Sequence, residues 1–349
     1  MNRYYTRACN FYYGKNSRKL INLKKTLPLN NRKDISFDNI QIISRNVSRK
    51  ISIHEINKLP NYLKKQVRRD LLNITKKVKS FLNINFNNEI HLMGILNITP
   101  DSFSDGGKFN EYQKATKQMY KLFKDGAKIV DVGGESTRPG SKAISEKEEW
   151  NRIKKTLKKI KKKNIISVDT RKASIMKKSL SLGAHIINDV SGLSYDKETI
   201  NLLKKTNVPF ILQHSLGSPE TMQLNPKYKN VVLEIYDFFE KKINFLRKLG
   251  IRHNKIILDP GIGFGKNLNH NVEILKNISI FHTLGFPILL GISRKRFIKD
   301  ISKENDSTDR LGGTLSSSIF ALQQGVQIIR VHDVNELQQG LKVYRELIR

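Results

Sequence analysis

The fold is decided by Ile165-Ile-Ser-Val-Asp-Thr170, a short β-branched run that ends in polar residues. A helical segment that closes at Gly183 follows it, and then comes a second run of the same kind, Ala184-His-Ile-Ile-Asn-Asp-Val190. The same alternation continues in both directions along residues 89–349 and predicts eight strands. They are His91–Asn97, Lys128–Gly133, Ile165–Thr170, Ala184–Val190, Val208–His214, Lys255–Asp259, Pro287–Ser293 and Ile328–Asp333.

Helical segments separate these strands, and glycines stand where helix C-terminal caps are expected. Eight strands alternating with helices are typical of a (β/α)8 TIM barrel of about 250 residues. A doubly wound open sheet is the alternative, because alternation alone does not show that the sheet closes. We favour the barrel, since the strands number eight and polar residues cluster at their ends. The clearest helices are Glu111–Lys124, Glu146–Lys162, Val231–Leu249 and Thr308–Gln324, and the capping glycines are Gly126, Gly183, Gly250, Gly285 and Gly325.

Polar residues at or just beyond the C-terminal end of every predicted strand indicate an enzyme. One such residue is commonly a helix cap or a loop hydrogen bond, but the same feature on all eight strands is harder to explain that way. Barrel enzymes build their sites at this end, from the loops that follow the strands. The residues concerned are Asn97, Asp131, Asp169, Asn188, Asp189, His214, Asp259, Ser293, Lys295, Arg330 and His332.

The charge of the chain is unevenly distributed. Its 349 residues include 64 Lys and Arg against 31 Asp and Glu, a net charge of +33, and residues 1–88 hold +16 of it. This shift in composition predicts a basic N-terminal extension over residues 1–88 and a barrel domain over residues 89–349. Alternating apolar residues from Ile40 to Ile53 predict strands, and an apolar stripe from Tyr62 to Leu82 predicts a helix. We therefore expect the extension to be a small α+β unit.

The basic extension could offer a surface to nucleic acid or anionic lipid. We favour the alternative, an accessory domain of unknown role with solvated lysines, because no nucleic-acid motif accompanies the charge. We expect no membrane span, since no apolar run approaches the ~20 residues that one requires. The chain shows no apolar signal segment and its single cysteine is Cys9, so we expect a cytoplasmic protein without internal disulfides.

The loop Asp259-Pro-Gly-Ile-Gly-Phe-Gly-Lys266 invites comparison with phosphate-binding loops but fails their pattern. Pro260 stands where the P-loop needs glycine, and Asn267 stands where it needs serine or threonine. The loop also lacks the third glycine of the dinucleotide-binding motif. We interpret its glycines as allowing the backbone to pass close to a flat ligand.

Two chemically different sets of residues are predicted to meet at the rim. Carboxylates and a carboxamide on three strands can pair with the edge of a heterocycle that offers both donors and acceptors, and these are Asp169, Asn188 and Asp259. Donors and positive charge suited to a diphosphate come from Thr137, Lys295, Arg330 and His332.

Long motifs in a fixed order identify a resemblance. They are Met93-Gly-Ile-Leu-Asn-Ile-Thr-Pro-Asp-Ser-Phe-Ser-Asp-Gly-Gly107, Asp131-Val-Gly-Gly-Glu-Ser-Thr-Arg-Pro-Gly140, Ile166-Ser-Val-Asp-Thr170, Ile186-Ile-Asn-Asp-Val-Ser-Gly192, Leu258–Asn267, Ser293-Arg-Lys295 and Ile329-Arg-Val-His-Asp333. Through these motifs residues 90–349 closely resemble the dihydropteroate synthases, folate-pathway transferases with a pterin-binding barrel. The resemblance implies that 6-hydroxymethyl-7,8-dihydropterin diphosphate condenses with 4-aminobenzoate in an SN1-like, Mg²⁺-assisted reaction, and that the chain forms a homodimer.

The resemblance also implies a role for each matching residue. It implies that the pterin ring is bound by Asp169, Asn188, Asp259 and Lys295, and the diphosphate by Thr137, Arg330 and His332. It also implies that 4-aminobenzoate is bound by Phe103, Arg138, Pro139 and Phe264, with Asp105 in the first of two covering loops. Mg²⁺ is expected to meet Asn97. The residues expected to act in catalysis are Asp105, Asp259, Lys295, Arg330 and His332.

Two departures from the family pattern stand out. Arg296 follows Lys295 where the family often has serine, which puts a local contact to the benzoate carboxylate in doubt. Ser215 replaces a frequent methionine, and we interpret this change as peripheral. Two alternatives remain open: a pterin-dependent methyltransferase on the same barrel, and a basic binding protein for nucleic acid or lipid with a relic barrel.

Overall fold

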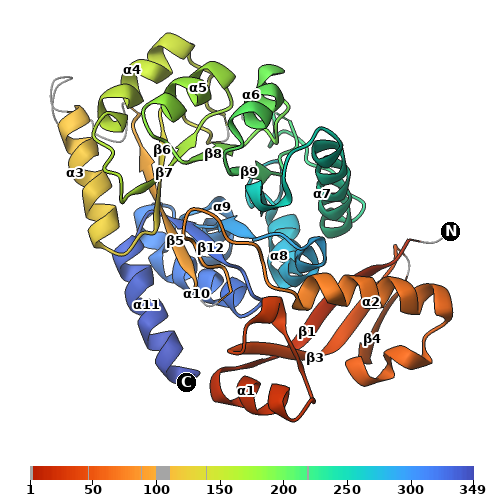
Figure 1. Ribbon diagram of the computed structural model, residues 1–349. Helices are drawn as coiled ribbons and strands as arrows, with labels where there is room; N and C mark the ends of the chain where they lie inside the picture. Colours follow the sequence, from red (N-terminus) through yellow and green to blue (C-terminus); the bar gives the residue numbers. More distant parts are fainter. Residues whose placement is uncertain (1–2, 46, 88, 100–110, 139, 218–219) are drawn as a thin grey trace.

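The computed structural model describes residues 3–45, 47–87, 89–99, 111–138, 140–217 and 220–349. The residues from 89 onward form a barrel of parallel strands surrounded by helices, and the extension lies beneath it in the view of Figure 1. In this described part of the chain we find no helix with the length and hydropathy of a membrane span.

Eight parallel strands form the barrel, which confirms the predicted (β/α)8 architecture. Each strand from β5 to β9 pairs with the next, and β12 pairs with both β5 and β11. The last seam closes through one bridge between Leu258 and Ile288, where the Leu258 N–H donates to the Pro287 carbonyl at 2.9 Å. The strands are β5 (His91–Asn97), β6 (Ile129–Gly133), β7 (Ile165–Asp169), β8 (Ile186–Asp189), β9 (Phe210–Gln213), β10 (Ile256–Asp259), β11 (Leu289–Gly291) and β12 (Ile328–Val331).

Helices cover the outside of the barrel, and all four helices singled out in the sequence form. Side chains of Ser145 and Asn230 accept backbone hydrogen bonds at the start of α4 and α7, which explains where those helices begin. All five predicted capping glycines have a positive φ. The helices are α3 (Glu111–Lys124), α4 (Glu146–Leu157), α5 (Ala173–Ser181), α6 (Glu198–Thr206), α7 (Val231–Lys248), α8 (Leu268–Lys276), α9 (Arg296–Ser302), α10 (Leu311–Leu322) and α11 (Val334–Leu347), with shorter 3-10 turns η4 (His253–Lys255), η5 (Ile278–Leu284) and η6 (Thr308–Arg310).

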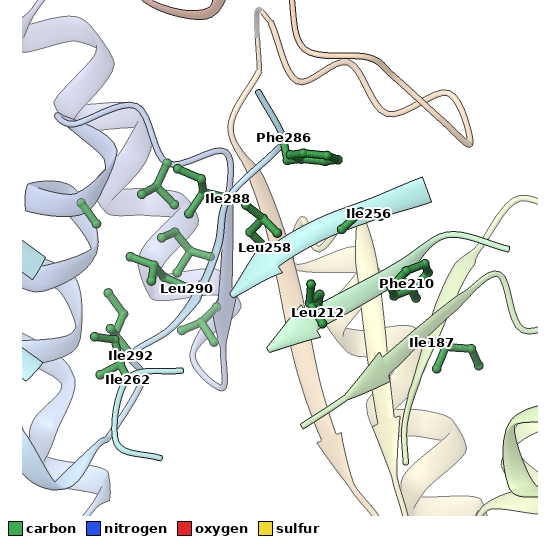
Figure 2. Close-up of a cluster of buried hydrophobic side chains, with 14 of the residues drawn as sticks. Ile187, Phe210, Leu212, Ile256, Leu258, Ile262, Phe286, Ile288, Leu290 and Ile292 are labelled. Atoms are coloured by element: carbon green, nitrogen blue, oxygen red, sulfur yellow. The ribbon is translucent and has the colours of Figure 1, made fainter. Parts of the chain in front are cut away.

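Successive residues of each strand face opposite sides of the barrel wall, and this alternation creates the site. Outward side chains such as Phe210, Leu212 and Leu258 join the large core between strands and helices, part of which Figure 2 shows. Inward side chains near the strand beginnings are apolar, namely Met93, Ile129, Ile186, Ile211, Ile257, Leu289 and Ile328. Two residues further along the same strands the barrel interior receives Ile95, Asp131, Asn188, Gln213, Asp259, Gly291 and Arg330.

The segment 78–86 closes the end of the barrel at which the strands begin, called here the barrel floor. Its apolar side chains Phe81, Ile84 and Phe86 are buried among the inward residues of the strand beginnings. The Asn87 side chain holds the segment in place by accepting from the Val78 N–H at 2.8 Å and donating to the Val78 carbonyl at 3.0 Å. The apolar spacing of the sequence predicts instead that the first part of this segment, as far as Leu82, continues the helix of the extension. The helix ends earlier because its last apolar residues are needed to fill the barrel floor.

The extension is an α+β unit with a core of its own. Strand β3 lies between β1 on one side and β2 and β4 on the other, all antiparallel. The apolar stripe of α2 packs on this sheet through Leu63, Val67, Leu71 and Ile74. The elements are β1 (Tyr5–Tyr13), α1 (Gly14–Asn22), β2 (Leu27–Pro28), η1 (Leu29–Asn31), β3 (Ile35–Ile43), β4 (Ser48–Ser52), η2 (Ile53–Lys58) and α2 (Asn61–Thr75).

Buried polar contacts join the extension to η5 of the barrel. The Ser279 hydroxyl donates to the Ala8 carbonyl at 2.9 Å, and Asn30 Nδ2 lies 3.1 Å from His282 Nδ1. His282 is fully buried, and burial lowers its pKa to about 4, so the ring is neutral in this contact. The extension and the barrel are therefore packed tightly together, while the domain boundary near residue 88 stays a prediction.

Candidate active site

The site lies inside the barrel at the C-terminal ends of the strands, where the inward side chains become polar. Arg330 on β12 is its central residue. The Nε of Arg330 donates to Asp131 Oδ2 at 2.7 Å, and its Nη2 donates to Asp169 Oδ2 at 2.9 Å. Because Asp131 and Asp169 lie on β6 and β7, the guanidinium reaches across the mouth of the barrel. Burial by itself lowers the pKa of Arg330, but the two carboxylates outweigh it and the pKa is raised.

Three inward side chains, on β6, β7 and β8, hold oxygens that the described protein does not pair. Asn188 Nδ2 donates to Asp131 Oδ2 at 2.9 Å, which leaves Asn188 Oδ1, Asp131 Oδ1 and Asp169 Oδ1 buried and unpartnered within the described residues. A buried polar atom without a partner is costly, and such atoms concentrate where a ligand supplies the missing hydrogen bond. The inner end of the site therefore suits a flat ligand whose edge carries N–H donors.

Asp259 and Lys295 form the opposite wall. Asp259 Oδ1 accepts from the Gly261 N–H at 2.8 Å, and burial raises the pKa of this carboxyl while Lys295 opposes the rise. Gly263, with φ +80°, lets the Lys295 side chain cross its backbone, since a Cβ there would stand 3.2 Å from Lys295 Cδ. The ammonium then lies 4.1 Å from the centre of the Phe264 ring. Phe264 is thereby held beside Lys295 by a cation–π contact.

His332 lies beside Arg330 at the rim. Its Nδ1 is 3.0 Å from the Ser293 hydroxyl, and burial with the charge of Arg330 lowers its pKa to about 3. His332 is therefore neutral at ordinary pH. The exposed Arg138 is near enough for its charge to contribute to this shift.

The strand β5 adds Asn97 to the same mouth. Its Oδ1 and the Asp169 side chain both lie over Gly133, within 3.6 Å of where a Cβ would stand. Thr137 is half-buried in the loop that follows β6. Strand pairing places Asn97, Gly133 and Asp169 side by side on β5, β6 and β7.

The structure thus gathers Asn97, Asp169, Asn188, Asp259, Phe264, Lys295, Arg330 and His332 at one mouth, with Thr137 and Arg138 on the adjoining loop. Phe103, Asp105 and Pro139 lie outside the described residues. Asp189, although it also ends a strand, directly follows the inward Asn188 and therefore points to the other side of the barrel wall, where its Oδ1 accepts from the Ser191 N–H at 2.8 Å. The individual ligand roles stay predictions.

The sequence pattern predicts no role for two residues of this mouth, Asp131 and Lys266. Asp131 lies at an inward position two residues before Gly133 and shares Arg330 with Asp169. Lys266 belongs to the loop that fails the phosphate-binding pattern. Its buried ammonium donates to the Phe264 carbonyl at 2.8 Å and lies 3.0 Å from His214 Nδ1, so it ties the loop after β10 to the end of β9. The alternation of inward and outward residues is a signal that could have found Asp131.

Most of the chain is similar in sequence to known proteins. A family model described as pterin binding enzyme matches residues 93–332. The dihydropteroate synthase of Escherichia coli strain K12 is 43% identical over 255 residues, which cover 72% of this chain and 90% of that protein. The dihydropteroate synthase of a Synechocystis species is 40% identical over 261 residues, 74% of this chain and 90% of that one.

Solved structures agree with this similarity. Yersinia pestis dihydropteroate synthase in a sulfonamide drug complex superposes with a TM-score of 0.72 at 36% identity, covering 77% of this chain and 98% of that one. The enzyme of Xanthomonas albilineans with 4-aminobenzoic acid superposes with a TM-score of 0.71 at 33% identity, covering 76% of this chain and 94% of that one. Both likenesses span most of the relative, so they extend over the whole barrel.

Proposed function

The chain belongs to the dihydropteroate synthase family of pterin-binding transferases, and from this premise we propose how its own residues carry out the condensation. The proposed substrates are 6-hydroxymethyl-7,8-dihydropterin diphosphate and 4-aminobenzoate. The products are 7,8-dihydropteroate and diphosphate. Relatives described with 4-aminobenzoic acid and with 7,8-dihydropteroate support this choice of substrate and product.

The observation that supports it best is the set of unpartnered oxygens at the barrel mouth. The pterin ring carries an amino group and ring N–H donors on one edge, and Asp169 Oδ1 and Asn188 Oδ1 are buried acceptors without a partner in the described chain. Asp259 at the end of β10 and Lys295 after β11 would face the ring from the opposite wall. Lys295 supplies donors where Asp259 supplies acceptors, so a ring with both on its edge would satisfy them together.

The proposed chemistry needs charge stabilisation and orientation from the protein. As the bond between the pterin methylene carbon and the diphosphate oxygen breaks, the electron pair leaves with the diphosphate. Arg330 at the mouth and the N–H groups of neighbouring residues would stabilise that negative charge. The amine nitrogen of 4-aminobenzoate then forms a bond to the methylene carbon and loses a proton to the departing diphosphate or to water. The wall formed by Phe264 and Lys295 would hold the arylamine in line.

A magnesium ion would be held chiefly by the diphosphate. Among the described residues no group of three His, Cys, Asp or Glu side chains could hold a metal by itself. The single carboxamide of Asn97 fits an ion that keeps most of its ligands from water and substrate phosphates. Such an ion would supply additional charge for the leaving diphosphate.

The direct test is diphosphate release by the purified chain, with and without 4-aminobenzoate and with and without Mg²⁺. We expect release to require both. The variant Lys295→Ala should lower kcat/KM by about 100-fold or more, whereas Lys299→Ala on the next turn of α9 should not. Binding of the pterin diphosphate without any release on adding 4-aminobenzoate would contradict the proposal and would revive the methyltransferase alternative.

We also propose a homodimer that uses α10 and α11. Their outer faces expose Phe320 at 45%, Val343 at 57% and Leu347 at 81%, which is unusual for large apolar side chains on neighbouring helices. Sedimentation of the intact chain should show a dimer. Replacing Val343 and Leu347 by lysine should yield monomers, and an unchanged dimer would place the interface elsewhere.

A further inference from the structure

The described parts of the loop between β6 and α4, residues 134–138 and 140–145, are tied together by one buried carboxylate. Glu135 is the second residue after β6, and its side chain is 3% exposed. Its Oε1 accepts from the Ile144 N–H at 3.0 Å, so the two ends of the loop are joined. The same carboxylate accepts from Arg171 Nε at 3.0 Å and from Lys172 Nζ at 3.0 Å. Both cations follow β7, so Glu135 also fixes this loop to its neighbour.

Further contacts define the shape of the loop. Arg152 of α4 donates from Nη1 to the Gly134 carbonyl at 2.8 Å. The Ser141 hydroxyl donates to the Ser136 carbonyl at 2.6 Å. These contacts hold the base of the loop on both sides of Thr137 and Arg138. Among the described residues, neither the Thr137 nor the Arg138 side chain makes a hydrogen bond. Arg138 is held through its backbone, whose N–H donates to the Ser136 hydroxyl at 3.4 Å and whose carbonyl accepts from the Ser141 N–H at 3.0 Å. The placement of both side chains therefore depends on the base of the loop.

The ionic cluster around Glu135 is buried and balanced in charge. The side chains of Arg171 and Lys172 are 7% and 5% exposed. Glu149 of α4 is the fourth member of the cluster; its side chain is 0% exposed, and its Oε2 lies 2.6 Å from Lys172 Nζ. Although burial alone would raise the pKa of Glu135, the hydrogen bonds from Arg171, Ile144 and Lys172 lower it. Glu135 is therefore a carboxylate. The Glu149 side chain shares Lys172 but, among the described residues, makes no hydrogen bond to either end of the loop.

We propose that Glu135 is a positioning residue for the reaction: by joining Ile144, Arg171 and Lys172 it holds Thr137 and Arg138 at the barrel mouth. Glu135 does not touch the proposed ligands itself. The inference rests on the proposed function and on the roles that the family resemblance implies, with Thr137 at the diphosphate and Arg138 at 4-aminobenzoate. It predicts that losing the carboxylate impairs the use of those groups while the pterin pocket of Asp169 and Asn188 is left intact.

Glu149→Gln is the matched control for Glu135→Gln, since both remove one buried carboxylate from the same cluster. We expect Glu135→Gln to raise the KM for 4-aminobenzoate at least tenfold and to speed amide hydrogen exchange in residues 136–143 at least tenfold. Affinity for 6-hydroxymethylpterin, which lacks the diphosphate, should stay within twofold. Glu149→Gln should leave both the KM and the exchange of this segment within twofold, whatever its thermal stability.

A purely structural role for Glu135 would be shown by equal changes in KM and exchange for the two variants, or by no change for Glu135→Gln. If Glu135→Gln fails to fold, Arg171→Lys keeps the charge but removes the guanidinium bonds, and it should give the same pattern in weaker form. Hydrogen exchange needs no turnover. A chain that forms no dihydropteroate therefore refutes the proposed function, while the exchange result still decides whether Glu135 holds the loop.

Discussion

Arg330→Met tests whether the barrel mouth depends on one guanidinium. Arg330 is 17% exposed, while its partners Asp131 and Asp169 are 0% and 4% exposed. Methionine has a similar length and fills much of the same space, but it leaves two buried carboxylates without the guanidinium that pairs with both of them. Asn188 then remains the one described donor to Asp131.

The expected loss follows from that geometry. Removing one partner of a buried ion pair usually costs about 3–5 kcal/mol, because the remaining charge stays buried and uncompensated. We expect a loss in this range at pH 7.5. The loss should be smaller at pH 5, since burial and the neighbouring carboxylate raise the pKa of Asp169 and the stranded group can then take up a proton. Adding Asp131→Asn to Arg330→Met should restore part of the stability for the same reason.

Urea denaturation of the ligand-free chain, followed by circular dichroism at both pH values, measures these differences. Arg296→Met is the control, because Arg296 is 80% exposed and its Nε is 3.7 Å from Asp300 Oδ1. Exposed pairs of this kind contribute little, so no measurable loss is expected. A loss below about 1 kcal/mol for Arg330→Met at pH 7.5 would refute the reasoning, as it would show that the carboxylates are not held as charges.

Three further results are expected. The pKa of His282 is lowered to about 4, below its ordinary 6.5, so the folded state loses stability as the pH falls through 6.5. This residue should account for ~2 kcal/mol of the unfolding free energy lost between pH 7.5 and pH 5. The same pH dependence of the unfolding free energy in His282→Gln would contradict this. Phe86→Ala should cost about 3–5 kcal/mol by opening the barrel floor, whereas Phe245→Ala, at a side chain that is 47% exposed, should cost far less in the same urea titration. Gly261→Ala should lower both the melting temperature and the affinity for 6-hydroxymethylpterin. Gly261 has a φ of +69°, and a Cβ there would stand 2.0 Å from the His214 carbonyl oxygen. An unchanged melting temperature would count against this.

The barrel could be predicted because its information is local. Alternation of β-branched runs with helices, and glycines after the helices, depends on neighbours in the chain. The same local pattern misled at residues 76–82, where the apolar spacing continues the stripe of α2. Val78 belongs instead to the barrel floor, because burial against Met93 and Ile129 is worth more than one further helical turn. A contact between segments so far apart leaves no local periodicity.

The candidate site shows the same division. The types of Asp169, Asn188, Asp259 and Lys295 and their positions at strand ends were sufficient to predict a polar rim. The hydrogen-bond partner of each side chain could not be predicted from the sequence, because Arg330 could pair with any carboxylate at the mouth. The ionic cluster of Glu135, Glu149, Arg171 and Lys172 also joins the loop after β6, helix α4 and the segment before α5, and no spacing in the sequence relates these parts.

By itself, the sequence determined the order of strands and helices, the family and the chemical character of the barrel mouth, because each depends on residue type and short-range spacing. Only the tertiary structure decided that Asp131 faces the site while Asp189 faces away, that residues 78–86 close the floor, and that the extension docks on η5 through Ala8 and Ser279. The physical reason is that closing the sheet brings inward side chains of distant strands within hydrogen-bond distance. Their pairing is then set by burial, which makes any unpaired charge or amide costly.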